Sequence, residues 1–529
     1  MIKLSITAMW AALTIGACFQ PVDPDNAPCP CGTGYECCAA TQTCRPTGQC
    51  STENPATDAG TDAGIDPGTD AGADAGSGLV LASLPMVSDG ALPSAAMVAQ
   101  LVEPMQFTTV GESVYVISRR AETCVAWDFS DYSPVVTRFE FVAGAWVLSW
   151  SSRLAVSGKE FALHASANGI TVVGSGQMTG EPARGGTEAF VVRLNLDGSE
   201  AWHRQFASIF DDAAQRVTEA DGRVIIAGST FGSLEGSTSQ GSRDAWVAVM
   251  SSVGSLEWFS QFGSSADEQP RGLLTLPGGA LVVHGSTGTA SDLFIRRFEA
   301  DGGTAWARQH AVADVGQVIP WGTGFAAGDT DRWSNFARLA ADGTLEWSLA
   351  RAPLPQSSVS ALAALDDQRF VIHGLQTDEM YMGPGVFPSR RLAEGVLDAD
   401  GGINVAQLGP WPVQIGGLWE PAIVHRPDGA WFVAGSANRG SSIANIFSLT
   451  GFEATGGTRL SNFDWRFEDP IYLTDNNAVG SLATAVPVGL RVLPSGAIVT
   501  AGRILVNGCN PNQGSTSTVG WLWLARVQP

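Results

Sequence analysis

A short apolar run that ends in glycine recurs along the chain after residue 79, and its spacing is the main structural signal of the sequence. Six intervals separate the copies from Gly174 to Gly502, about 55 residues each, which lies in the range of propeller and array repeats. The copies occupy residues 172–174, 226–228, 283–285, 326–328, 372–374, 433–435 and 500–502. This repetition predicts one supersecondary unit used many times rather than a series of unrelated domains.

A second landmark, a tight turn followed by tryptophan, comes after the better copies. In the first of them Asp197-Gly198 is followed by Trp202. The same five-residue step from the first turn residue to tryptophan ends at Trp258, Trp306 and Trp347. Asp-Gly between alternating apolar segments is typical of a β-hairpin, so we expect each turn to join two antiparallel strands.

The segments before these turns alternate as strands do. Phe190, Val192 and Leu194 fall on one face of such a strand, and residues 189, 191 and 193 fall on the other. Both faces are largely apolar, as expected for a small sheet between two neighbours, and no segment after residue 79 has sustained helical periodicity. The sequence predicts an all-β fold, a β-propeller of four-stranded blades, with a solenoid as the alternative.

The seven glycine runs and a matching run without glycine at residues 114–118 predict about eight blades, alternatively seven. The last unit has its third strand at residues 521–527, but the chain ends before a fourth. Residues 79–84 are apolar and have no blade of their own, so we expect them to supply the missing strand and close the ring, which removes exposed sheet edges. Cys124 and Cys509 lie at matching places in the first and last units. We expect a disulfide between them across the seam, with two unpaired thiols as the alternative.

The first residues have the pattern of an export signal. Residues 1–17 read as a secretory leader, because Lys3 precedes an apolar run too short to span a bilayer. The run ends in Ile-Gly-Ala-Cys, which resembles the lipobox of bacterial lipoproteins. The resemblance implies cleavage before Cys18 and acylation of that residue, palmitate included, and Phe19 after it favours the outer membrane. An ordinary cleavable leader is the alternative.

Residues 18–50 hold Cys18 and six further cysteines, an even number that predicts a small disulfide knot in an exported chain. The six are Cys29, Cys31, Cys37, Cys38, Cys44 and Cys50, and their pairing stays open. A zinc site is the alternative, although no histidine lies among them. Residues 51–78 repeat Thr-Asp-Ala-Gly loosely and predict a flexible acidic linker. The β-propeller is expected over residues 79–529.

Charge and composition exclude some functions. A net charge of -22 would repel a phosphate backbone, so we expect no nucleic-acid partner. The chain has no Gly-x-Ser-x-Gly elbow, phosphate loop or His-Glu-x-x-His pair, and we expect no catalytic residue, no metal and no cofactor.

Two sets of titratable residues recur with the repeat. His284 and His373 stand just before the glycine of their copies, and we interpret them as core or channel residues, with ligands or bases as the alternative. Paired acids at residues 211–212 and 267–268 fall between blades, where a structural role is expected. A glycosidase pair is the alternative there.

Two stretches, residues 376–391 and 461–477, exceed the repeat length. Long loops on rigid scaffolds commonly carry recognition, and aromatic side chains beside acids suit a glycan or a protein surface. Tolerated insertions are the alternative. The candidate binding residues are Tyr381, Phe387, Phe463, Trp465, Phe467 and Tyr472.

The segment over residues 188–228 resembles the bacterial β-propeller repeat of large exported proteins. Residues 244–285 and 292–328 resemble it too, the latter less well after Trp306. This resemblance implies the fold and transfers no catalytic residue. The Asp-Gly-x-x-x-Trp element also resembles the tryptophan-docking repeat of quinoprotein-type propellers.

Address and architecture together predict a monomeric, lipid-anchored propeller, exposed on the cell surface, that binds a protein or polysaccharide without catalysis. One alternative is a periplasmic scaffold like the eight-bladed lipoprotein of the outer-membrane assembly machinery. Another is a quinoprotein-like dehydrogenase. That enzyme would need an adjacent cysteine pair at its cofactor, whereas Cys37-Cys38 precedes the ring.

Overall fold

The structure is a computed structural model of the chain, which divides into two compact units. One unit comprises Met1–Thr69 and Tyr472–Ala478, and the other comprises Asp70–Ile471 and Val479–Pro529. The structure describes residues 35–38, 43–46, 81–83, 86–88, 94–98, 102–120, 134–288, 291–313, 315–329, 335–350, 357–364, 369–376, 389–397, 403–411, 423–438, 445–453, 459–467, 484–507 and 518–527. No helix of these residues is long and apolar enough to cross a membrane.

The smaller unit contains one described hairpin. Its strands are β1 (Tyr35–Cys38) and β2 (Thr43–Pro46), and their register places Cys37 opposite Cys44. The other predicted knot cysteines and Cys18 lie outside the described residues.

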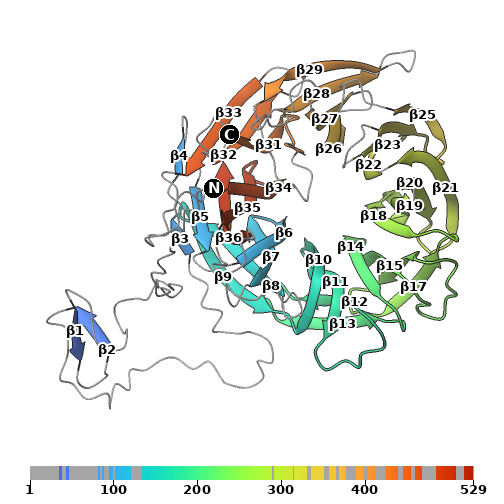
Figure 1. Cartoon of the computed structure of the whole chain (residues 1–529), viewed down its shortest axis with the longest axis horizontal. Helices are drawn as coiled ribbons and strands as arrows, with labels where there is room; N and C mark the ends of the chain where they lie inside the picture. Colours follow the sequence, from blue (N-terminus) through green and yellow to red (C-terminus); the bar gives the residue numbers. More distant parts are fainter. Residues whose placement is uncertain are drawn as a thin grey trace, which may run out of the picture. The chain divides into compact units, whose positions relative to one another are not determined.

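In the larger unit, eight antiparallel sheets of described strands follow one another around a ring (Figure 1). Their first strands lie nearest the centre and their fourth strands at the rim. The predicted all-β propeller with four-stranded blades is therefore confirmed, and we number the blades 1 to 8 in chain order.

The strands of the first four blades form sheets of four. Blade 1 contains β6 (Val102–Val110), β7 (Ser113–Arg120), β8 (Pro134–Val142) and β9 (Ala145–Arg153); blade 2 contains β10 (Val156–Ser166), β11 (Gly169–Met178), β12 (Glu188–Leu194) and β13 (Glu200–Phe206); blade 3 contains β14 (Asp212–Ala220), β15 (Arg223–Thr230), β16 (Asp244–Met250) and β17 (Leu256–Phe262); blade 4 contains β18 (Glu268–Thr275), the 3-10 turn η1 (Pro277–Gly279), β19 (Leu281–Thr287), β20 (Asp292–Phe298) and β21 (Thr304–Ala313).

Blades 5 and 6 repeat this sheet, and blades 7 and 8 each have five strands. Blade 5 contains β22 (Val315–Trp321), β23 (Gly324–Asp329), β24 (Asn335–Leu339) and β25 (Leu345–Ala350); blade 6 contains β26 (Ser357–Ala364), β27 (Arg369–Gln376), β28 (Ser389–Leu397) and β29 (Ile403–Trp411); blade 7 contains β30 (Ile423–His425), β31 (Trp431–Asn438), β32 (Asn445–Phe452), β33 (Arg459–Phe467) and β4 (Met86–Ser88); blade 8 contains β34 (Thr484–Val492), β35 (Ile498–Asn507), β36 (Thr518–Val527), β5 (Ser94–Val98) and β3 (Leu81–Ser83).

The repeated sequence landmarks occupy the expected strands. Every glycine run lies in the second strand of its blade, and the Asp-Gly turn joins the third strand to the fourth. The middle strands β12, β15, β16 and β19 are almost entirely buried, because each small sheet packs against a neighbouring blade on both faces. The apolar character of both strand faces follows from this packing.

In blades 1 to 4, the tryptophan of the fourth strand docks on the turn of the next blade. Trp202 packs on Gly254, whose φ is +85°, and its indole N–H donates to the Ser252 carbonyl oxygen at 2.9 Å. A Cβ at Gly254 would lie 2.8 Å from the indole, so glycine is required there by both backbone angle and space. The same packing joins Trp150 to Gly198, Trp258 to Gly302 and Trp306 to Gly343.

The ring closes through the segment that precedes blade 1, although a different strand from the expected one pairs with β36. The sequence predicts that residues 79–84 supply this strand, but β5 occupies the place beside β36 and β3 lies one place further out. The reason is chain connectivity: β5 ends at Val98 and β6 begins at Val102, so β5 is the strand nearest to blade 1 along the chain.

Side chains from the first and last blades hold this seam together. Phe107 of blade 1 packs in one core cluster with Val499 and Leu524 of blade 8. On the surface, Glu112 accepts hydrogen bonds from the Ser495 N–H and hydroxyl at 2.8 and 2.9 Å and forms an ion pair with Arg526 at 3.1 Å. The predicted bridge between Cys124 and Cys509 lies outside the described residues.

Candidate functional site

The topology gives the ring two different faces. Because neighbouring strands are antiparallel, the turns from first to second strand and from third to fourth strand lie at one face, here called the turn face. Connections from second to third strand and from one blade to the next lie at the opposite face, the loop face. The ends of β27 and β33 and the starts of β28 and β34, which flank the two long stretches noted in the sequence, lie at the loop face.

The structure corrects the expected loop position of part of the candidate binding set. Phe463, Trp465 and Phe467 lie in β33, so the stretch at residues 461–477 begins as the fourth strand of blade 7 and not as a loop. Aromatic residues alternate there with polar ones, which is the period-two pattern of a strand and is not visible in the repeat length alone. Tyr381, Phe387 and Tyr472 lie outside the described residues.

The loop face carries an exposed apolar pair between blades 2 and 3. Ile209 is 73% exposed and Phe210 is 52% exposed in the connection from β13 to β14. The backbone beneath them is fixed, because the Phe210 N–H donates to the Ser208 hydroxyl at 3.1 Å and the Ser208 N–H donates to Asp212 at 2.5 Å. A Cβ at Gly232 would overlap the Ser208 side chain, so the neighbouring loop packs closely against this base.

The second acid of each pair noted in the sequence, Asp212 or Glu268, lies at the base of a loop between blades. Asp212 also accepts hydrogen bonds from the hydroxyls of Ser208 and Thr230 at 3.1 and 2.5 Å, and its burial raises the pKa of its carboxyl group. Glu268 repeats the arrangement one blade later, with the Ser264 and Thr287 hydroxyls at 2.5 and 2.6 Å. Both carboxyl groups are buried and fully used in loop packing, which fits the structural role expected for them.

A buried ion pair joins the same two blades near the turn face. Arg193 donates to Glu219 at 2.9 Å and to the Thr171 hydroxyl at 2.6 Å, and the Ser166 hydroxyl and the Asn168 amide also donate to Glu219. Burial alone would raise the pKa of Glu219, but the hydrogen bonds from Asn168 and Ser166 and the charge of Arg193 together lower it. A pair satisfied in this way is a structural element of the seam.

The two histidines that precede repeat glycines lie in second strands, two blades apart. His284 in β19 is fully buried, and burial, with a smaller effect of Arg216, lowers its pKa to about 3. Its Nδ1 atom is buried without a hydrogen-bond partner. Its register partner is Gly272, which makes room for the imidazole, and the register partner of His373 is Ala361. His284 is therefore a neutral core residue.

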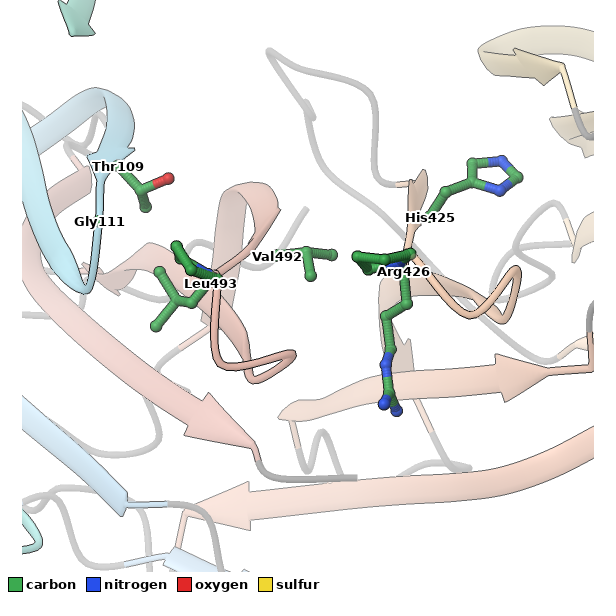
Figure 2. Close-up of a pocket in the computed structure, with 8 residues that line it drawn as sticks. Thr109, Gly111, His425, Arg426, Val492 and Leu493 are labelled. Atoms are coloured by element: carbon green, nitrogen blue, oxygen red, sulfur yellow. The ribbon is translucent and has the colours of Figure 1, made fainter. Parts of the chain in front are cut away.

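A pocket of about 520 Å³ opens at the turn face where turns of blades 1, 7 and 8 meet (Figure 2). Burial lowers the pKa of His425, and the His425 ring and the Arg426 side chain point in different directions. The Nε2 atom of His425 and the Nε atom of Arg426 are buried and have no hydrogen-bond partner, so neither atom is accessible from the pocket. The lining residues are Thr109, Gly111, His425, Arg426, Pro427, Val492, Leu493 and Pro494.

This pocket does not have the geometry of an acid–base centre, since its two titratable side chains do not converge on one point. No sequence pattern indicates this pocket, because its lining comes from three turns far apart in the chain. In the part of the chain that the structure describes, no group of three or more His, Cys, Asp or Glu side chains is arranged to hold a metal ion.

Solved structures with a related arrangement of strands share little sequence with this chain. A europium-containing methanol dehydrogenase is 12% identical, with a TM-score of 0.43 over 84% of this chain and 93% of that one. The C-terminal WD40 domain of Sif2 is 11% identical, with a TM-score of 0.39 over 80% and 98%. The WD40 domain of SCAP from fission yeast is 10% identical, with a TM-score of 0.39 over 84% and 94%. No family model and no curated protein matches the chain.

These likenesses concern strand arrangement only, and at such scores none carries a functional argument. The β-propeller assignment rests on the sheets described above. The resemblance to the exported bacterial repeat stays an expectation from the sequence.

Proposed function

We propose that the chain is a monomeric, non-enzymatic binding module of the cell envelope that engages a protein or polysaccharide through the loop face of its propeller. The observation that carries this proposal is the exposed pair Ile209 and Phe210 on a hydrogen-bonded base. Because the backbone that carries these exposed apolar side chains is already fixed, binding does not have to order the loop. Aromatic side chains also contribute strongly to the free energy of binding at interfaces. The ends of β27 and β33, after which the two long stretches of the sequence continue, lie at the same face.

The proposed location is outside the cell, on a lipid anchor in the outer membrane. It rests on the Ile-Gly-Ala-Cys sequence that ends at Cys18 and on the acidic linker at residues 51–78, which would hold the propeller away from the membrane surface. The periplasmic scaffold is the competing location for the same anchor.

Binding is tested by removing the apolar pair. The full chain and its Ile209→Ser/Phe210→Ser variant are titrated against arrayed purified bacterial surface polysaccharides and against envelope proteins crosslinked to the wild-type chain on intact cells. We expect at least about a tenfold loss of affinity in the variant, because it lacks the two apolar side chains that would become buried in the complex. Val253→Ser is the matched control, since Val253 is 75% exposed but lies at the turn face. Equal binding by all three proteins would contradict the proposal.

Location is tested by protease treatment of intact cells, followed by detection with an antibody against the propeller. We expect cleavage in the linker at residues 51–78 without disruption of the outer membrane, because that segment is rich in small polar residues. Protection until the outer membrane is opened would replace this proposal with the periplasmic scaffold.

A further inference from the structure

Two arginines border the exposed apolar pair Ile209 and Phe210 on the loop face. Arg184 lies in the connection from β11 to β12, and Arg243 ends the connection from β15 to β16. The topology places both connections at the same face as the apolar pair, which lies between β13 and β14. Cations from two loops therefore stand beside an apolar pair that a third loop carries.

The β11–β12 connection packs directly on the backbone of the pair. A Cβ at Gly185, the residue after Arg184, would overlap the carbonyl group of Ile209. Asp211 Oδ1 accepts hydrogen bonds from the Thr187 N–H at 2.7 Å and from the Thr187 hydroxyl at 3.1 Å. The backbone of Arg184 is therefore held next to Ile209, and its side chain is exposed.

The β15–β16 connection packs against the same pair from blade 3. A Cβ at Gly232 would lie 3.3 Å from the Cδ2 atom of Phe210. The N–H of the preceding residue, Phe231, donates to the Asp211 carbonyl oxygen at 3.1 Å. The Arg243 guanidinium lies over the Phe231 ring, with its carbon 4.3 Å from the ring centroid. A continuous row of contacts thus links Arg243 to Phe210.

Neither guanidinium forms a hydrogen bond or an ion pair with a residue that the structure describes. The Nε atom of Arg243 is buried without a partner, whereas its two terminal nitrogens stay accessible. By contrast, Arg204 in blade 2 pairs with Glu235 of blade 3 at 2.9 Å. An arginine that is stacked on a ring and has free terminal donors is preorganised to bind a carboxylate through two parallel hydrogen bonds.

Most acids near these loops are already engaged within the chain. The Asp211 carboxylate accepts from Thr187, and Glu181 lies 3.5 Å from His203. Asp267 is the exception: its backbone pairs with that of Arg243, and its exposed carboxylate forms no ion pair with a described residue. In a chain of net charge -22, two unpaired arginines at one place are a local exception and favour a negatively charged partner.

The chemistry of the apolar pair favours a protein over a polysaccharide. Ile209 is aliphatic and 73% exposed, so it gains free energy in an apolar pocket and little against hydrated sugar hydroxyls. The hydroxyls beside the pair, those of Ser208 and Thr187, already donate to Asp212 and Asp211. They are therefore committed to the fold and not free to recognise sugar hydroxyls.

We infer that the loop face binds a protein segment in which apolar side chains stand next to Asp or Glu, an inference that rests on the proposed function. The apolar side chains pack on Ile209 and Phe210. The carboxylates accept hydrogen bonds from Arg184 and Arg243. Aromatic side chains and arginine are the residue types that contribute most to binding at protein interfaces.

The probe is a library of random peptides displayed on phage and selected on the immobilised full chain. Peptides that bind the wild type but not Ile209→Ser/Phe210→Ser are expected to combine apolar residues with Asp or Glu. Replacing those acids with Asn or Gln in a selected peptide should weaken its binding to the wild-type chain by about tenfold, because charged hydrogen bonds are lost. This measurement needs no variant of the protein to fold.

The matching change in the protein is Arg184→Gln/Arg243→Gln. This variant is expected to bind the same peptides about tenfold more weakly and to lose most of the salt dependence of binding. The charge-matched control, Arg271→Gln/Arg308→Gln, removes two arginines from β18 and β21 of blade 4 and should bind as the wild type does. An equal loss in the control would reflect net charge alone and would overturn the inference.

The remaining outcomes separate this inference from the proposed function. Selected peptides that need the apolar pair but carry no excess of Asp or Glu, or that bind Arg184→Gln/Arg243→Gln as tightly as the wild type, would overturn the inference and leave the proposed function standing. If no selected peptide and no polysaccharide depends on the apolar pair, both fail. Binding of polygalacturonate that requires the pair and both arginines, without any selected peptide, would replace the protein partner with an acidic polysaccharide.

Discussion

At the scale of single residues, the structure explains why a bulky imidazole is tolerated where most other copies carry Val or Ala. A Cβ at Gly272 would overlap the Nε2 atom of His284, so the small register partner makes the room. The imidazole then lies in apolar surroundings, and its neutral form is the one compatible with folding. The sequence marked this position as unusual, but the compensation on the neighbouring strand is visible only in the register.

This burial predicts a pH dependence that belongs to His284. The folded-state pKa of about 3 lies below the ordinary value of 6.5, so the unfolded chain binds the proton first as pH falls. The contribution of the neutral His284 to the free energy of unfolding is complete above pH 6.5. It falls by about 2 kcal/mol between pH 6.5 and pH 5. In His284→Ala this part of the loss disappears, as urea unfolding at pH 7 and pH 5 would show. His203→Ala removes an imidazole whose pKa is raised by its hydrogen bond to Glu200, so its loss should be no smaller than that of the wild type, and a loss in His284→Ala as large as in the wild type would refute the assignment.

At the scale of elements, the sequence predicted each turn and its tryptophan but not the partner of the indole. The five-residue step lies within one hairpin, whereas the docking contact joins Trp202 to Gly254 in the next blade. Trp150 was missed because its hairpin turns at Ala143-Gly144 and its step is two residues longer, although it docks on Gly198 in the same manner. Strand type follows from local pattern, but contacts between blades depend on packing.

The docking predicts a coupled pair of variants. Gly254→Ala is expected to cost about 2 kcal/mol, because the new Cβ meets both an unfavourable φ and the Trp202 ring. Trp202→Leu removes the ring and the indole hydrogen bond, and in that background the cost of Gly254→Ala should fall to its backbone part. A double-mutant cycle from chemical unfolding measures the difference. Gly236→Ala measures the backbone part alone, since the φ of Gly236 is +78° and nothing lies near its Cβ position. If the costs of Gly254→Ala and Trp202→Leu are additive in the double variant, the docking contact is contradicted.

At the scale of the whole propeller unit, the need for closure could be predicted, because a unit lacking one strand leaves an unpaired edge. The identity of the closing strand could not. Both residues 79–84 and residues 94–98 are apolar enough, and the choice is decided by the distance along the chain to blade 1. Ile209 and Phe210 were not among the predicted binding residues, because the connection from β13 to β14 is short and only stretches longer than the repeat were singled out.

The closing strand carries the last prediction. Ala96 lies in β5 between β3 and β36, with Ser83 and Leu524 as its register partners. A paired strand therefore lies beside its N–H whichever way that N–H points. Ala96→Pro removes a ladder hydrogen bond and is expected to destabilise the propeller by about 3 kcal/mol. Hydrogen exchange should then increase in β36 and β6, since the freed edge lies at the seam between the last and first blades.

The matched control places proline in the outer strand of the same sheet. Ala82→Pro changes β3, which has a partner on one side only, and is expected to cost less and to leave exchange in β6 unchanged. If both proline variants lower the free energy of unfolding equally, the pairing of β5 does not hold the ring closed. If reductant increases hydrogen exchange at the seam while Ala96→Pro does not, closure rests on the bridge expected between Cys124 and Cys509. A large loss confined to Ala96→Pro would show instead that the paired strand holds the ring closed, with the ion pair of Glu112 and Arg526 beside it.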